Sequence, residues 1–141
     1  PIGLGLEAAI AFKAISTMDS MIGYKKPGLK ELGYAGARLD DLANWIPARL
    51  SIILIALARP RGARSAIREA FKYHSATPSP NSGWPMAAAA GSLKIRLEKP
   101  GQYILLGENP NPETRYIFRA TGLVQSAIAL TLAAAFICLL L

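Results

Sequence analysis

Three aspartates in this sequence lie beside strongly apolar segments: Asp19, Asp40 and Asp41. Ionisable groups next to membrane-like helices are functional candidates, because placing a charge in an apolar setting is costly. Carboxylates at such places suit two kinds of chemistry, the binding of a hard cation such as Mg²⁺ together with phosphates, and proton transfer. Alternatively, Asp40 and Asp41 start a helix, where the helix dipole stabilises a carboxylate. Their spacing leaves both interpretations open.

Three cations, Lys13, Arg38 and Arg49, occupy similar settings. Arg49 lies inside the apolar segment 42–58, and an arginine at the centre of a membrane span costs about 2.5–3.5 kcal/mol on insertion scales. We therefore expect Arg49 to reach the membrane interface, to pair with a carboxylate or to face a cavity. Two neutral candidates for polar contacts are Asn44 and Asn81.

The common catalytic motifs are absent from the sequence. It contains no phosphate-binding G-x-x-x-x-G-K-[ST] loop, no H-E-x-x-H, no G-x-S-x-G and no C-x-x-C. His74 is the only histidine, and we expect this loop histidine to be exposed to solvent rather than catalytic. The single cysteine, Cys138, excludes a disulfide scaffold and a cysteine-based zinc site.

Composition and the last segment both indicate a membrane protein. The chain has 141 residues, 52% of them hydrophobic, 18% charged, and a net charge of +7. Residues 120–141 carry no charge, and as a helix they would extend about 33 Å against a hydrocarbon core of about 30 Å. We predict a transmembrane helix here. Arg115 and Arg119 precede it, so the positive-inside rule places the basic segment 59–119 in the cytoplasm and the C-terminus outside.

The first half of the chain reads as helices with polar interruptions. Residues 1–24 form an apolar helix with one polar stripe, and residues 25–36 form a glycine-rich loop. A second helix follows over residues 37–58, and we predict a break at Pro47, which cannot donate a backbone hydrogen bond. The short apolar stretch after it suggests a re-entrant segment that keeps Asp40 and Asp41 on the cytoplasmic side.

The second half continues this helical pattern. Residues 59–72 predict an amphipathic helix on an anionic membrane surface, and its lack of interleaved aromatic residues argues against nucleic-acid binding. Residues 84–97 predict a helix whose small residues 87–91 let another helix approach closely. Residues 73–83 and 98–119 are predicted loops. The predicted fold class is all-α, a polytopic integral membrane bundle with amphipathic and re-entrant helices.

Three long blocks of this sequence resemble a known family. FKAISTMDSMIGYK (residues 12–25), GYAGARLDDLANWIPARL (33–50) and SPNSGWPMAAAAGSLKIRLEKPGQY (79–103) are similar, in order, to blocks of the CobD/CbiB cobalamin-biosynthesis proteins. The resemblance covers residues 1–141 as a single membrane domain. It implies an inner-membrane enzyme, adenosylcobinamide-phosphate synthase, which forms an amide between aminopropanol, or its phosphate, and adenosylcobyric acid, using ATP and Mg²⁺.

The resemblance also suggests roles for individual residues. Asp19, Asp40 and Asp41 become the expected catalytic groups, with Asp40 and Asp41 as metal ligands. The expected partners are the corrinoid, the amine and membrane lipids, without nucleic acid. The expected substrate-binding residues are Lys13, Arg38, Asn44, Arg49, Ser79 and Asn81.

One departure from the family pattern is a matter of length. Family members are considerably longer, with further membrane helices and a polar block resembling E-N-x-S-D-G ahead of the part that this chain resembles. We therefore expect the chain to be a C-terminal half that needs the N-terminal half for activity. The alternative is a non-catalytic membrane sensor or scaffold of related ancestry, in which the polar residues hold helices together.

Overall fold

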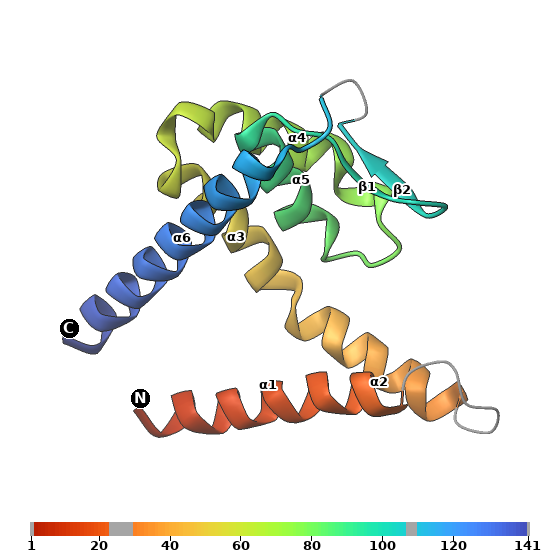
Figure 1. The fold of residues 1–141 in the computed structure, drawn as a ribbon. Helices are drawn as coiled ribbons and strands as arrows, with labels where there is room; N and C mark the ends of the chain where they lie inside the picture. Colours follow the sequence, from red (N-terminus) through yellow and green to blue (C-terminus); the bar gives the residue numbers. More distant parts are fainter. Residues whose placement is uncertain (1, 23–29, 107–109, 141) are drawn as a thin grey trace. The chain divides into compact units, whose positions relative to one another are not determined.

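Helices dominate the computed structural model, which describes residues 2–22, 30–106 and 110–140 (Figure 1). Over these residues the protein is 80% helical, which confirms the predicted predominance of helices. Two single-turn 3₁₀ helices, η1 and η2, flank the fourth helix. The elements are α1 (Ile2–Ile22), α2 (Lys30–Ala43), α3 (Trp45–Ala58), η1 (Pro60–Gly62), α4 (Ala63–Tyr73), η2 (His74–Ala76), α5 (Gly83–Leu93), β1 (Leu97–Lys99), β2 (Tyr103–Leu105) and α6 (Thr114–Leu140).

A short β-hairpin interrupts the predicted loop 98–119. Strands β1 and β2 pair antiparallel, with Glu98 opposite Ile104, and Gly101 adopts a positive φ of 73° in the turn between them. Strands of three residues are too short to show a two-residue periodicity, so the sequence pattern gave no sign of them. The last part of the predicted loop already belongs to α6, which begins at Thr114.

The described chain groups into two units, an N-terminal unit (Pro1–Ile46) and a C-terminal unit (Pro47–Leu141). In the N-terminal unit, α1 packs against α2. The two helices are in ordinary van der Waals contact at Gly36, where a Cβ would lie 3.6 Å from Met18 Cε and 3.8 Å from Asp19 Cα. The contact therefore brings the end of α1 beside α2.

Helix α2 begins at Lys30, inside the predicted loop 25–36, so that boundary prediction is wrong. Gly33 and Gly36 pointed to a loop, since each glycine costs a helix about 1 kcal/mol relative to alanine. Packing against α1 offsets this cost. Residues 23–29 of the predicted helix end and loop lie outside the described residues.

The break between α2 and α3 falls at Asn44 rather than at Pro47. The Asn44 backbone N–H donates to Asp40 O at 2.9 Å, and α3 begins at the next residue, Trp45. Pro47 then lies in the first turn of α3. The missing N–H of proline is harmless there, because the first N–H groups of a helix have no partner within the helix. The predicted break is therefore correct in kind and slightly misplaced.

Helices α4 and α5 form the core of the C-terminal unit through small residues. Ala66 and Ala70 of α4, and Ala87 and Ala88 of α5, are fully buried. At Gly91 a Cβ would lie 2.8 Å from Ser65 O, so glycine is required for this approach. The close helix contact predicted for residues 87–91 is confirmed.

The face of α4 that packs on α5 is not the predicted apolar stripe. Ala66, Glu69 and Ala70 are buried, whereas Ile67 and Phe71 of the predicted stripe remain 44% and 64% exposed. The predicted basic residues Arg64, Arg68 and Lys72 are also exposed. Helix α5 ends at Leu93 instead of residue 97, because Lys94 takes a left-handed conformation that stops the helix.

Two helical segments among the described residues are long and apolar enough to cross a membrane, Gly33–Ala58 and Thr114–Leu140. Along α6 only Leu123 is buried, while large side chains such as Phe118 (75%) and Leu140 (71%) are exposed. Most of α6 extends beyond α4 and α5 (Figure 1). So much exposed apolar surface on one helix is consistent with membrane association.

Candidate active site

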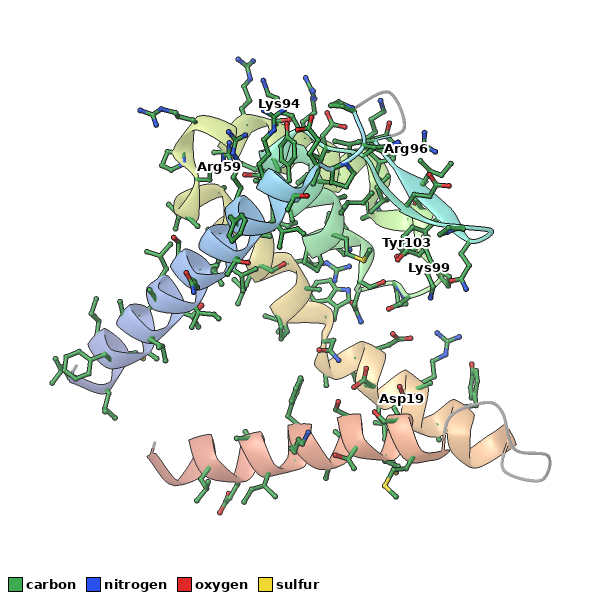
Figure 2. All side chains as sticks on the ribbon, viewed as in Figure 1. Asp19, Arg59, Lys94, Arg96, Lys99 and Tyr103 are labelled. Carbon is green, nitrogen blue, oxygen red and sulfur yellow. The ribbon has the colours of Figure 1, made fainter. Side chains whose placement is uncertain are left out.

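The three predicted catalytic carboxylates come together in the N-terminal unit. Asp19 is on α1, Asp40 and Asp41 are on α2, and all three are half-buried. The charges of Asp40, Arg38 and Asp19 all act on the Asp41 carboxyl group. Figure 2 shows Asp19 at the part of α1 that meets α2. Helix packing thus brings Asp19 of α1 beside Arg38, Asp40 and Asp41, which are close together on α2.

Asn44 holds the Asp40 carboxylate in place. Its side-chain Nδ2 donates to Asp40 Oδ2 at 2.9 Å and to the Asp40 backbone oxygen at 2.9 Å. The Asn44 amide therefore bonds to a backbone carbonyl in the last turn of α2 and also orients the Asp40 carboxylate. The position of Asn44 supports a role in orienting Asp40, and its contact with substrate stays a prediction.

Tyr34 was not identified from the sequence, although it contacts a predicted residue. Arg38 Nε donates to Tyr34 Oη at 2.9 Å, and the guanidinium carbon lies 5.1 Å from the centre of the tyrosine ring. Their spacing of four residues on a helix is the signal that could have paired them. Tyr34 thereby holds Arg38 near the acidic side chains.

The donor set of this cluster suits a hard cation. Carboxylate and amide oxygens are the ligands that Mg²⁺ prefers, and Mg²⁺ usually takes only one or two carboxylates together with phosphate oxygens and water. Within the described residues, no group of three or more His, Cys, Asp or Glu side chains is arranged to hold a metal ion. Asp40 and Asp41 are consecutive on a helix and so do not face each other. A magnesium ion here would depend on phosphate oxygens for the rest of its ligands.

A second cluster, in the C-terminal unit, surrounds Trp84 at the start of α5. The Arg49 guanidinium carbon lies 5.0 Å from the centre of the Trp84 ring, a cation–π geometry. The His74 ring stacks on Trp84 with centroids 4.0 Å apart and planes 4° apart. Phe71 meets Trp84 edge-on at 5.3 Å. An aromatic face was not among the three environments expected for Arg49.

The expectation that His74 is a solvent-exposed loop residue is wrong. His74 is half-buried against Trp84. The reason is backbone packing at Gly83, where an added Cβ would overlap the His74 carbonyl oxygen. This contact draws η2 onto the start of α5. His74 and Trp84 are ten positions apart and lie in different helices, so only the fold could pair them.

Hydrogen bonds among its own residues hold the loop before α5. Ser79 Oγ accepts from the backbone N–H of Asn81 at 3.3 Å and of Ser82 at 3.4 Å. The Thr77 hydroxyl donates to Ser79 O at 3.0 Å and accepts from the Ser82 hydroxyl at 3.0 Å. Ser79 therefore stabilises the loop that leads into α5. Asn81 is buried, with 6% of its surface exposed.

The predicted site residues thus divide between the two units. The N-terminal unit holds the acids, Arg38 and Asn44, and it also holds Lys13, which is exposed on α1. The C-terminal unit holds the remaining substrate-binding candidates, Arg49, Ser79 and Asn81.

These features define a class of protein: helical, with apolar helices suited to a membrane and a carboxylate cluster where two helices meet. The family described as CobD/CbiB protein matches residues 2–135, and this chain belongs to it. A "Probable cobalamin biosynthesis protein CobD" of Methanothrix thermoacetophila is 57% identical over 128 residues, which are 91% of this chain and 40% of that protein. The "Cobalamin biosynthesis protein CobD" of Rhodobacter capsulatus is 41% identical over 136 residues, 89% of this chain and 42% of that protein.

The chain spans about two fifths of the length of these curated relatives and matches their C-terminal part. The family resemblance of the three sequence blocks is therefore confirmed. No solved structure gives a significant match.

Proposed function

We propose that the protein containing this region is a membrane ligase of cobalamin biosynthesis, which attaches aminopropanol or its phosphate to adenosylcobyric acid in a reaction that uses ATP and Mg²⁺. Membership in the CobD/CbiB family and the names of the relatives support the pathway. The observation that carries the proposal is the cluster of Asp19, Asp40 and Asp41 with Arg38 at the contact of α1 and α2. Such a cluster suits proton transfer and magnesium-bound phosphates.

The proposed reaction makes one amide bond. A carboxylate carbon of the corrinoid gains a bond to the amine nitrogen, and one carboxylate oxygen leaves on the phosphoryl group taken from ATP. The ammonium group of the amine must lose protons before its nitrogen can attack. Bound magnesium with ATP would supply the phosphoryl group and neutralise its charge.

The residues of this chain would act on the proton and on the phosphate. An aspartate of the cluster accepts a proton from the amine. Asp40, oriented by Asn44, and Asp41 are the proposed magnesium ligands, since both offer hard oxygen atoms. Arg38 is the proposed partner of the phosphate or of the substrate carboxylate, because a guanidinium matches both groups. Lys13, Arg49, Ser79 and Asn81 remain proposed substrate contacts.

The proposed setting is the inner membrane, crossed more than once. The two apolar segments Gly33–Ala58 and Thr114–Leu140 support this setting. We place the basic segment 59–119 on the cytoplasmic side, where ATP is available, and the C-terminus outside. In the relatives, the matched region is preceded by further sequence, and we propose that this preceding part contributes to the same site.

A direct assay of the full-length protein tests the proposed function. The protein is reconstituted in proteoliposomes and supplied with adenosylcobyric acid, ATP, Mg²⁺ and either aminopropanol or its phosphate. We expect mass spectrometry to detect the amide product with at least one of the two amines, and none when ATP or the corrinoid is omitted. Binding of the corrinoid without any amide product would refute the ligase and favour the sensor or scaffold.

The contact between Asn44 and Asp40 gives a smaller, separate prediction. Replacing Asn44 by alanine removes the amide that orients the Asp40 carboxylate. We expect about a tenfold loss of kcat, which corresponds to about 1.4 kcal/mol. The matched control is Ser51→Ala, which removes a half-buried hydroxyl that bonds only to Ala48 O in its own helix. Equal rates for the Asn44 variant and this control would argue against the orienting role.

A further inference from the structure

A groove with a volume of about 340 Å³ lies in the C-terminal unit, where η1, the end of α5 and the start of α6 meet. No carboxylate lines it. Figure 2 shows two of its residues, Arg59 and Lys94, at this end of the unit. The polar residues that line it are Arg59, Arg61, Ser92, Lys94, Tyr116 and Arg119.

The four cations of the groove lack acidic partners within the described part of the chain. Three other arginines of the unit do have such partners: Arg68 pairs with Glu69, Arg96 with Glu98, and Arg115 with Glu113. Four like charges around so small a space repel one another, and a bound anion would relieve that repulsion. Guanidinium groups match the oxygen geometry of phosphate in particular.

Ser92 provides a second, independent indication of a ligand. Only 2% of its surface is exposed, and its hydroxyl has no hydrogen-bond partner among the described residues. Gly62 packs directly against Ser92, because a Cβ at this glycine would lie 2.6 Å from Ser92 O and 2.8 Å from Ser92 Oγ. A buried hydroxyl without a partner is unfavourable, and an anion in the groove would give it one.

Lys94 occupies a backbone position that favours glycine. It ends α5 in the left-handed region, with φ 56° and ψ 51°, where a side chain is disfavoured and glycine is the usual residue. Its side chain lines the groove. Glycine would be the more stable residue at this position. The presence of lysine there is consistent with a functional role for its ammonium group.

The groove lies at the polar ends of the apolar helices. Arg59 directly follows α3, and Arg119 directly precedes the charge-free part of α6. Tyr116, over whose ring the Arg119 guanidinium lies at 5.3 Å, is a residue type that favours the membrane interface. This is the level at which lipid phosphates are found.

We propose that this groove is a binding site for a phosphate group, carried by an anionic phospholipid headgroup or by a soluble phosphate ester. Arg59, Arg61, Lys94 and Arg119 surround the phosphate oxygens, and Ser92 Oγ donates to one of them. The observations behind the proposal are independent of the proposed amide-forming reaction, whose phosphate-bearing substrates, ATP and aminopropanol phosphate, belong to the soluble class. The position of the groove favours the lipid as the source of the phosphate.

Binding measurements on the full-length protein in neutral detergent test the site. Phosphatidylglycerol, phosphatidylcholine and inorganic phosphate are titrated separately, with native mass spectrometry for the lipids and calorimetry for phosphate. For Lys94→Gly and for the double variant Arg59→Gln/Arg119→Gln we expect at least a fivefold loss of affinity for phosphatidylglycerol or for inorganic phosphate. A loss of affinity for phosphatidylglycerol alone assigns the site to a lipid headgroup. A loss of affinity for both phosphatidylglycerol and inorganic phosphate shows that the site also binds soluble phosphate.

Two comparisons separate binding from folding. Arg115→Gln removes one positive charge from the same end of α6, but Arg115 does not line the groove, so the affinities of this variant should stay within twofold of wild type. Lys94→Gly should keep or raise the melting temperature while it weakens binding. Affinities of Lys94→Gly and of the double variant within twofold of wild type for both phosphatidylglycerol and inorganic phosphate would overturn the proposal.

Discussion

Asp41→Asn in the full-length protein is expected to lower the rate of amide formation about 10² to 10³-fold, the range typical for removal of a positioned acid–base group. Asp41 is the acid on which Asp19, Asp40 and Arg38 all act. The substitution keeps the size of the side chain and removes its charge. The measurement is product formation per amount of protein in the membrane, at saturating substrates.

The dependence of the rate on Mg²⁺ concentration distinguishes metal binding from proton transfer as the role of each aspartate. If Asp40 and Asp41 bind the cation, Asp40→Asn and Asp41→Asn should both raise the Mg²⁺ concentration needed for half-maximal rate. Asp19→Asn, which changes the other helix, should lower kcat with less effect on that concentration.

Glu7→Gln is the matched control for the loss of a carboxylate. Glu7 is exposed on α1, the same helix that carries Asp19. We expect its turnover to equal that of wild type. If Asp40→Asn and Asp41→Asn also turn over within threefold of wild type, the carboxylate cluster has no part in catalysis.

Gly83→Ala should destabilise the C-terminal unit by about 3 kcal/mol, at the upper end of the range for overpacking. A Cβ at this position would overlap the backbone carbonyl of His74, and backbone atoms cannot rotate away as a side chain can. The clash has to separate η2 from α5. The thermal midpoint of the detergent-solubilised protein should fall by about 5–10 °C.

The stack of His74 on Trp84 provides a local readout of the same change. Trp45→Phe leaves Trp84 as the fluorescent tryptophan of the described residues. Separation of η2 should shift the emission of Trp84 toward that of an exposed indole. Gly122→Ala is the control, because no atom lies within 4 Å of the added Cβ and alanine favours a helix. If Gly83→Ala has the same thermal midpoint and the same emission as Gly122→Ala, the close contact between Gly83 and the His74 carbonyl is absent.

The sequence predicted element types well where the pattern was long. Residues 120–140 of the apolar stretch and the small residues 87–91 both lie in helices, because a long apolar run and small side chains are local properties of the sequence. Boundaries were less well predicted. The starts of α2 and α6, the break at Asn44 and the short hairpin depend on packing that outweighs local preference.

The sequence by itself determined the helical character of this protein, its apolar segments and, through three ordered blocks, its family. The tertiary structure decided which polar residues meet. Asp19 reaches Asp41 because α1 packs against α2, and His74 reaches Trp84 because Gly83 leaves room for a backbone carbonyl. Spacing along a helix specifies only the face on which a side chain lies. Which faces come into contact depends on close packing between segments that are distant in the chain.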